Sequence, residues 1–441
     1  MDNQVSELIE KIRQQFENSP YPRIPLEKSP KDDFNALYIH NLITSYYLRY
    51  QKVADTAGKV ILDAGCGSGY KSLVLAEANP GARIVGIDLS EESVKLARQR
   101  LQHHKFENVE FHALSIYDLP ELGLEFDYIN NDEVLYLLPD VVAGLQAMKS
   151  VLKPQGIIRT NLHSAIQRSG YFRAQELFKM MGLMESNPEE MEIGVAIETM
   201  KSLKDGVELK ARAWNVSYEA PDAKETLLSN HLLVGDRGYT IPEMFAALQA
   251  ADLEFVSMVY WRHWDVTDLF QDPDNLPAFW AMSLPEVSVE ERLHLYELLH
   301  PVHRLLDFWC AHPSQGDSFV AVDQWERSDW EGAKVHLHPQ LKSPKVREDL
   351  IECITKQKPF GSSSYVTIPA MAPVEIDSTL AACLLPLWEG AQPFRSIVER
   401  WLKIRPLDLV SLEPVSEETA FEEMKKFLTK LQVFLYVLLE R

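Results

Sequence analysis

The chain has 441 residues and a formal net charge of −21, with 46% hydrophobic and 25% charged side chains. This is the composition of a globular protein long enough for about two or three domains without disulfides. So acidic a chain is not expected to bind nucleic acid, and its scattered cysteines, polar N-terminus and short apolar runs predict a cytoplasmic protein with no metal site and no membrane span.

The first elements in chain order are helical. Apolar side chains between Val5 and Phe16 follow helical spacing, prolines interrupt residues 20–30, and a second helical stretch covers residues 35–53. Residues 1–55 are therefore expected to be mainly helical, and Tyr21, Tyr38 and His40 are their notable side chains.

Short apolar runs alternating with helical segments follow. This alternation is typical of βαβ units with a parallel sheet. The expected strands are residues 60–62, 84–87, 109–113, 126–129 and 156–160, and the expected helices between them are residues 70–77, 90–103 and 141–152.

Beyond this region the pattern is less regular. Residues 165–236 are expected to be an insertion with a strand at 207–211, before a helix at 241–251 and a strand at 253–260 that complete the sheet. The chain is then expected to be mainly helical, with one long amphipathic helix over residues 417–439. The sequence thus predicts three parts: residues 1–55, 56–264 and 265–441.

The first strand of the alternating region ends in a glycine loop. Asp63 is followed by Gly65, Gly67 and Gly69 and then by a helix. Glycines allow a sharp turn and a close approach of backbone to ligand, and the N–H groups of a helix start favour the polar end of a nucleotide. A dinucleotide fingerprint would need a third glycine where this chain has Tyr70.

An acidic residue closes the next strand as well. Asp88 stands twenty-five residues after Asp63, where a carboxylate can accept both hydroxyl groups of a ribose.

Residues 60–69 resemble motif I of the class I S-adenosylmethionine-dependent methyltransferases, and residues 86–90, 126–140 and 151–156 are similar to later motifs of that family. The resemblance implies a Rossmann-like, doubly wound α/β fold, S-adenosylmethionine as cofactor and a substrate-covering helical lid in residues 1–55. The family often has an aspartate where this chain has Ser115, so the adenine contact is expected from Ser115 or the Ile116 backbone. The implied cofactor-binding residues are Asp63, Gly65, Cys66, Gly67, Gly69, Asp88, Leu89, Ser115, Ile116 and Asn131.

No catalytic residue follows from these motifs. Asn131, Asp132 and Tyr136 are expected at the floor of the site, and Asp132, Tyr136 and His163 lie near strand ends where a general base would stand. The acceptor is left open between a small molecule and a protein side chain. A nicotinamide-dependent oxidoreductase and a non-catalytic, cofactor-binding regulatory protein are the alternatives.

The last part of the chain carries a weaker resemblance. Residues 295–312 and the helical tail resemble the regulatory regions of bacterial protein-lysine methyltransferases, and the turn at residues 387–390 resembles part of a winged-helix module. Because the chain is so acidic, this region is expected to bind protein or to pack internally, and not to bind nucleic acid.

Overall fold

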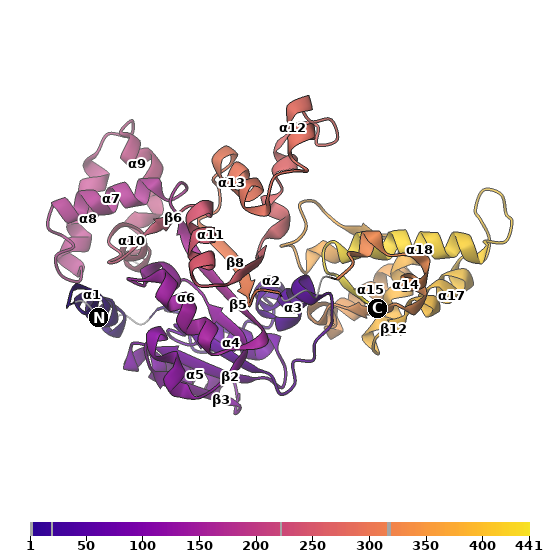
Figure 1. Ribbon diagram of the computed structural model, residues 1–441, viewed down its shortest axis with the longest axis horizontal. Helices are drawn as coiled ribbons and strands as arrows, with labels where there is room; N and C mark the ends of the chain where they lie inside the picture. Colours follow the sequence, from indigo (N-terminus) through magenta and orange to yellow (C-terminus); the bar gives the residue numbers. More distant parts are fainter. Residues whose placement is uncertain (1–2, 19–20, 221–222, 315–318) are drawn as a thin grey trace.

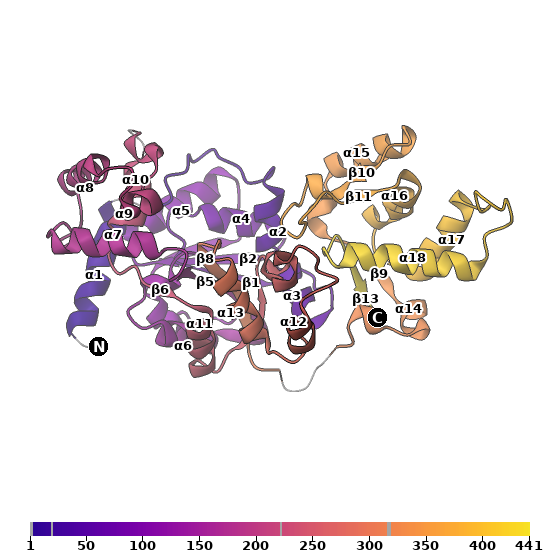
Figure 2. The same ribbon diagram turned by 90° about the horizontal axis from the view of Figure 1, so that it is seen from above.

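The computed structural model of the protein describes residues 3–18, 21–220, 223–314 and 319–441. The sheet-containing part and a smaller C-terminal module lie at opposite ends of an elongated molecule (Figures 1 and 2). None of the helices within the described ranges is both long and apolar enough to cross a membrane.

The main sheet has the strand order β3-β2-β1-β4-β5-β8-β7, with β6 paired to β5. The first five strands are parallel, and β8 runs antiparallel to both of its neighbours. The predicted Rossmann-like α/β fold is confirmed. The strands are β1 (Val60–Ala64), β2 (Arg83–Asp88), β3 (Val109–Ala113), β4 (Phe126–Asn131), β5 (Leu152–Ser164), β6 (Gly238–Tyr239), β7 (Glu254–Met258) and β8 (Leu305–Ala311).

Both faces of this sheet are buried, which is why its strands are continuous apolar runs. Leu62 faces one core and its neighbour Ile61 faces the other, as the twofold period of a strand requires. The first core is closed by α6 (Val141–Ser150), α11 (Ile241–Ala250) and α13 (Val289–Leu299), and the second by α3 (Leu42–Tyr50), α4 (Tyr70–Ala78) and α5 (Glu91–His103).

Strand β8 corrects the expected limit of the sheet. Its residues 305–311 lie inside the range predicted as the C-terminal region, which was expected to begin at residue 265. The strand enters the sheet because Phe308 and Trp309 fill the two opposite cores. The sheet therefore extends to Ala311, and α12 (Ala278–Ser283) and α13 belong to the connection between β7 and β8.

The region between β5 and β6 forms a helical cap with its own apolar core. The strand predicted at residues 207–211 is wrong, because this segment forms α9 (Glu208–Ala213) and buries Ala213 in that core. Helix α1 (Asn3–Asn18) lies beside the cap (Figure 1), and Lys11 Nζ donates to the Glu185 carbonyl at 3.2 Å. The other helices of the cap are α7 (Ser169–Met180), α8 (Glu190–Ser202) and α10 (Lys224–His231).

The C-terminal module packs five helices around a three-stranded sheet of order β12-β9-β13. The single helix predicted over residues 417–439 is wrong only beyond Gln432, where the chain leaves α18 and then pairs with β9. The winged-helix comparison stays a prediction. The elements are α14 (Arg327–Gly332), β9 (Lys334–Leu337), α15 (Pro344–Thr355), β10 (Phe360–Gly361), β11 (Glu375–Ile376), α16 (Ser378–Leu384), β12 (Gln392–Pro393), α17 (Phe394–Ile404), α18 (Glu417–Gln432) and β13 (Val437–Glu440).

The N-terminal segment joins the module to the sheet-containing part. In α2 (Phe34–His40), the Tyr38 hydroxyl donates to the Phe434 carbonyl at 2.9 Å. In α3, the Tyr47 hydroxyl donates to the Leu439 carbonyl at 3.0 Å and accepts from the Leu439 N–H at 2.9 Å. The segment predicted as a lid thus also anchors the last strand of the chain.

Candidate functional site

A cavity of about 760 Å³ lies where the parallel strands end. The carboxyl ends of the strands in such sheets are where ligands bind. Of the ten residues implied by the family resemblance, seven line this cavity: Gly65, Cys66, Gly67, Asp88, Leu89, Ser115 and Ile116.

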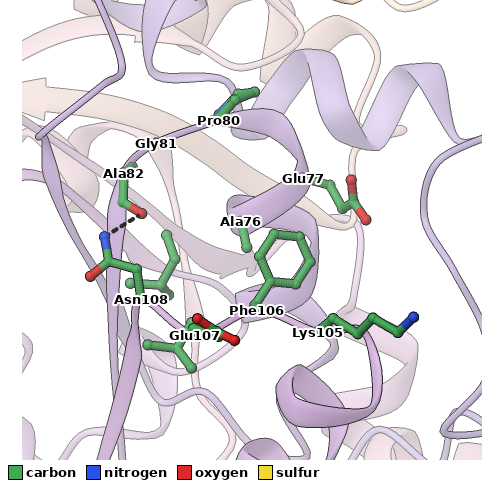
Figure 3. Close-up of a pocket in the computed structure, with 11 residues that line it drawn as sticks. Ala76, Glu77, Pro80, Gly81, Ala82, Lys105, Phe106, Glu107 and Asn108 are labelled. Atoms are coloured by element: carbon green, nitrogen blue, oxygen red, sulfur yellow. Dashed lines mark hydrogen bonds between the residues drawn. The ribbon is translucent and has the colours of Figure 1, made fainter.

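A second cavity of about 380 Å³ lies at the opposite edge of the sheet, around Phe106 and Asn108 (Figure 3). Asn108 precedes β3 and donates from Nδ2 to the Ala82 carbonyl, just before β2, at 3.2 Å. The lining of this second cavity is mostly apolar and includes none of the predicted site residues. The larger cavity is therefore the candidate site.

The glycine loop needs glycine for two different reasons. Gly65 and Gly67 have φ values of +88° and +50°, and a Cβ atom would lie 2.4 Å from Val134 Cγ2 in the first case and 2.2 Å from the Tyr21 carbonyl oxygen in the second. Gly69 has φ +82°, and its Cβ would lie 2.5 Å from Ala97 Cα in α5. The first two glycines shape the cavity wall, whereas Gly69 lets two helices pack closely.

Asp88 connects the ends of β2 and β1. Its Oδ2 accepts from the Gly67 N–H at 2.9 Å, and its Oδ1 accepts from the Ser90 N–H at 2.9 Å. Burial raises the pKa of this carboxyl above its usual value, against the opposing effect of these hydrogen bonds. Because a carboxylate has about four acceptor positions, Asp88 can still accept the hydroxyl groups of a ligand in the cavity.

Two of the implied residues, Asp63 and Asn131, lie behind the cavity wall. Asp63 accepts from Ser72 Oγ at 2.6 Å and Asn130 Nδ2 at 2.8 Å, and burial raises the pKa of its carboxyl to about 6. Asn131 Nδ2 donates to the Ala64 carbonyl at 2.8 Å. Both side chains hold the ends of β1 and β4 in place, so the structure brings them next to the site without exposing them to it.

The segment after α1 is fixed to the glycine loop. The Ser68 N–H donates to the Tyr21 carbonyl at 2.9 Å, and Ser68 Oγ donates to the Pro22 carbonyl at 2.7 Å. Arg100, which is buried, donates to the carbonyls of Ser68 and of residues 24–25 at 2.7–3.0 Å. Sequence reasoning missed Arg100. Its position beside the apolar face of α5 was a signal that this arginine could be buried.

A group of charged side chains, most of them buried, supports the floor of the cavity. Lys71 Nζ lies 2.8 Å from Asp132 Oδ2, and Arg159 Nη2 lies 3.3 Å from Asp132 Oδ1 and 2.7 Å from Asp307 Oδ2. His40 Nε2 lies 2.9 Å from Arg159 Nη1. Burial alone would raise the pKa of Asp132, but Arg159 and Lys71 hold it well below its usual range.

Lys71 and Asp132 line the cavity, and Arg159 holds Asp132 from behind. Asp132 was among the expected floor residues, whereas sequence reasoning assigned no role to Lys71, Arg159 or Asp307. The available signal was Arg159 itself, a charge within the apolar run of β5.

His163, at the end of β5, also lines the cavity and is 1% exposed. Its Nδ1 lies 2.6 Å from Asp236 Oδ1, and its ring stacks on that of Tyr136 with centroids 3.6 Å apart. Arg304 Nη1 lies 3.1 Å from His163 Nε2 and forms a two-pronged ion pair with Glu133. Tyr136 and His163, which were each expected near the ends of the strands, are thus brought together, and Asp236 is a partner that sequence reasoning missed.

Metal chemistry has no obvious ligands among these groups. Across the ranges that the structure describes, no three His, Cys, Asp or Glu side chains are grouped to hold a metal ion. The neighbouring histidines His336 and His338 are apart from the site: His336 lies in β9, and His338 is buried with its Nε2 3.0 Å from Thr44 Oγ1.

Comparison with known proteins identifies the sheet-containing part. A family model described as "Methyltransferase domain" matches residues 55–218. An uncharacterized protein of Synechococcus is 26% identical over 299 residues, covering 67% of this chain and 70% of that protein. The Ubiquinone biosynthesis O-methyltransferase of Actinobacillus pleuropneumoniae is 30% identical over 134 residues, and the match spans 29% of this chain and 56% of that enzyme.

Among solved structures, PKMT2 from Rickettsia typhi in complex with AdoHcy shares the fold with a TM-score of 0.58 and 18% identity. This match covers 95% of the chain and 76% of PKMT2, so the likeness in fold includes the C-terminal module. The family match decides against the nicotinamide-dependent alternative and makes S-adenosylmethionine the cofactor. Residues 55–218 thus form a methyltransferase domain similar to those of the class I S-adenosylmethionine-dependent methyltransferases.

Proposed function

We propose that S-adenosylmethionine lies along the carboxyl edge of the sheet, with its nucleoside at β3 and β2, and that the methyl acceptor enters over β4 and β5. In this arrangement Ser115 and Ile116 hold the adenine, Asp88 the ribose, and residues 65–67 the groups beyond it.

The strand order supports this placement. The cavity-lining residues follow β3, β2, β1, β4 and β5 in the order in which these strands stand side by side. Adjacent strands are about 4.8 Å apart, so the path from β3 to β4 is roughly 14 Å long. This length suits an extended nucleoside joined to an amino acid, and in the proposed arrangement the transferable methyl group would lie near Asp132.

The charges of the cavity support the orientation. Lys71 and Asp132 present an ammonium and a carboxylate 2.8 Å apart, which complements the carboxylate and ammonium of an amino acid. Asp88 stands on β2, where a hydroxyl-bearing sugar would lie. The reverse orientation would leave the Lys71–Asp132 pair beside an uncharged base.

Bound S-adenosylmethionine supplies a sulfonium methyl group that an aligned nucleophile can attack. The residues of the chain provide alignment and exclusion of water, since α1 and the segment after it cover the cavity and Arg100 fixes that segment. The cavity is also walled by Ile12 and Phe16 of α1 and by Leu228 and Leu233 from the cap. The walls enclose the reactive group of a small molecule or of one side chain.

The single observation that carries the proposal is that Asp88 and the glycine loop line the same cavity as Asp132 and His163. Isothermal titration calorimetry with S-adenosylhomocysteine and with NADH tests it. We expect binding of S-adenosylhomocysteine alone, and at least tenfold weaker binding by Asp88→Asn. Glu91→Gln, an exposed acid in the first turn of α5, is the control and should bind as the wild type does.

Two results would overturn the placement. One is unchanged affinity in a folded Asp88→Asn variant, and the other is binding of NADH in preference to S-adenosylhomocysteine. Binding without methyl transfer to any component of a cell extract would instead favour the non-catalytic alternative.

A further inference from the structure

The acceptor end of the cavity contains a histidine held in one orientation. The Asp236 carboxylate, whose side chain is fully buried, accepts from His163 Nδ1 at 2.6 Å, from Gln175 Nε2 at 2.9 Å and from Arg168 Nη2 at 3.2 Å. Stacking on Tyr136 fixes the plane of the imidazole ring. A carboxylate with three donors stays ionised, so it keeps the proton of His163 on Nδ1 and leaves Nε2 as an acceptor.

We propose that His163, oriented by Asp236, is the general base that removes the proton from a hydroxyl group of the methyl acceptor. This inference rests on the cofactor placement proposed above. With the methyl donor ending near β4, the next strand is β5, and His163 stands at its carboxyl end. The group that faces the methyl carbon from the acceptor side therefore lies within reach of Nε2.

The step balances without a further reactant. The bond between the methyl carbon and sulfur breaks and its electron pair stays on sulfur, while a bond forms between the methyl carbon and the acceptor oxygen. The electron pair of the O–H bond stays on oxygen, and the proton moves to Nε2 of His163. The imidazolium that forms is stabilised by the ionised Asp236 beside Nδ1.

The walls favour a hydroxyl over an ammonium group as the acceptor. Tyr136 stacks on His163, and Leu228 and Leu233 of the cap line the same cavity. A neutral hydroxyl on an apolar or aromatic skeleton costs far less to transfer into such surroundings than a charged amine does. A carboxylate acceptor would need no base and would leave the arrangement of His163 and Asp236 without use.

His163 is surrounded by charges from several elements. Burial lowers the pKa of His163, Arg168 and Arg304 lower it further, and Asp236 opposes them, so the ring is neutral at pH 7. Arg304 occupies Nε2 in this structure, but its side chain is 43% exposed and is held by Glu133, which is 30% exposed. An acceptor hydroxyl takes the place of Arg304 Nη1 on Nε2, and Arg304 keeps its pair with Glu133.

The tautomer can be tested without turnover. Long-range proton–nitrogen NMR on histidine-labelled protein should show His163 neutral at pH 7 with its proton on Nδ1, and Asp236→Asn should abolish this preference. An Nε2–H tautomer, or an imidazolium at pH 7, would overturn the proposal.

Methyl transfer is tested with tritiated S-adenosylmethionine and an undesalted cell extract as the source of acceptor. His163→Gln should lower transfer at pH 7 by about 100- to 10,000-fold, the usual share of a general base. The residual rate should rise about tenfold per pH unit, because the acceptor must then lose its proton to solvent. Wild-type transfer should be flat above pH 7, and the control variant His300→Gln, at an exposed site, should match it.

The product and the binding data separate the remaining outcomes. The label should resist alkali and pass through a cation exchanger, as a methyl ether does; an alkali-labile ester or a retained methylamine would overturn the proposal. So would the absence of any labelled product, or equal pH profiles for wild type and His163→Gln. Loss of S-adenosylhomocysteine binding by the wild type would instead contradict the cofactor placement, and unchanged binding by His163→Gln shows that this variant is folded.

Discussion

Arg159 offers a sharp test of the buried charges beneath the cavity. Its side chain is 4% exposed. Among the residues that the structure describes, Arg159 donates to both carboxylate oxygens of Asp307, at 2.7 and 3.2 Å. Arg159→Met leaves Asp307 buried without this partner, whereas Asp132 keeps Lys71. Removing one partner of a buried ion pair costs about 3–5 kcal/mol of folding free energy.

Urea denaturation followed by circular dichroism measures this loss. The pKa of Asp307 is already raised by burial in the wild type, with Arg159 opposing the increase, so removing Arg159 raises it further. A folded-state pKa above the unfolded value means that the folded state binds more protons. The stability that Arg159→Met loses relative to the wild type should therefore shrink as the pH falls toward about 4 and grow as the pH rises.

Two further variants make the test specific. Arg159→Met combined with Asp307→Asn should recover at least half of the lost stability, because the uncompensated charge is gone. Arg83→Met, which breaks the exposed pair with Glu110, should cost less than about 1 kcal/mol. A loss below about 1 kcal/mol for Arg159→Met, or one independent of pH, would refute the reasoning.

Three other changes have defined outcomes. The folded-state pKa of Asp63, about 6, lies above the unfolded value, so the wild type should lose about 2–3 kcal/mol of stability as the pH rises from about 4 to about 6. Asp63→Asn should remove this loss, and denaturation midpoints that keep their pH dependence would contradict the prediction. Gly67→Ala should weaken S-adenosylhomocysteine binding at least tenfold in calorimetry, since its Cβ would lie 2.2 Å from the Tyr21 carbonyl oxygen, and unchanged affinity would exclude that clash. Tyr47→Phe should cost about 1–3 kcal/mol by removing the hydroxyl that bonds both backbone groups of Leu439, and should speed proteolysis of the C-terminal module; equal digestion rates would contradict the bridge.

The parallel sheet and the cofactor end of the site could be predicted because their signals are local. Each strand is a short apolar run, and the glycine loop and Asp88 come directly after the strands that position them. A turn that requires positive φ restricts its own residues, so Gly65 and Gly67 reveal it without any knowledge of distant contacts.

The limits of the sheet depended on distant pairing. Strand β8 follows β7 by more than forty residues and was read as part of a helical region, yet it enters between β5 and β7. The end of the predicted last helix became β13 for the same reason, since β9 offers it hydrogen bonds that no local pattern reveals. Apolar runs of this length suit a helix or a strand equally, and the partner decides between them.

The sequence by itself determined the fold class, the methyl donor and the residues of the glycine loop, because neighbouring residues carry that information. Only the tertiary structure joined His163 to Asp236, Arg159 to Asp307 and Arg100 to the segment that covers the cavity. These pairs are separated by 73, 148 and 76 positions, so neither periodicity nor spacing connects them. Buried charged groups find partners wherever the chain brings them, since an unpaired one would cost too much to bury.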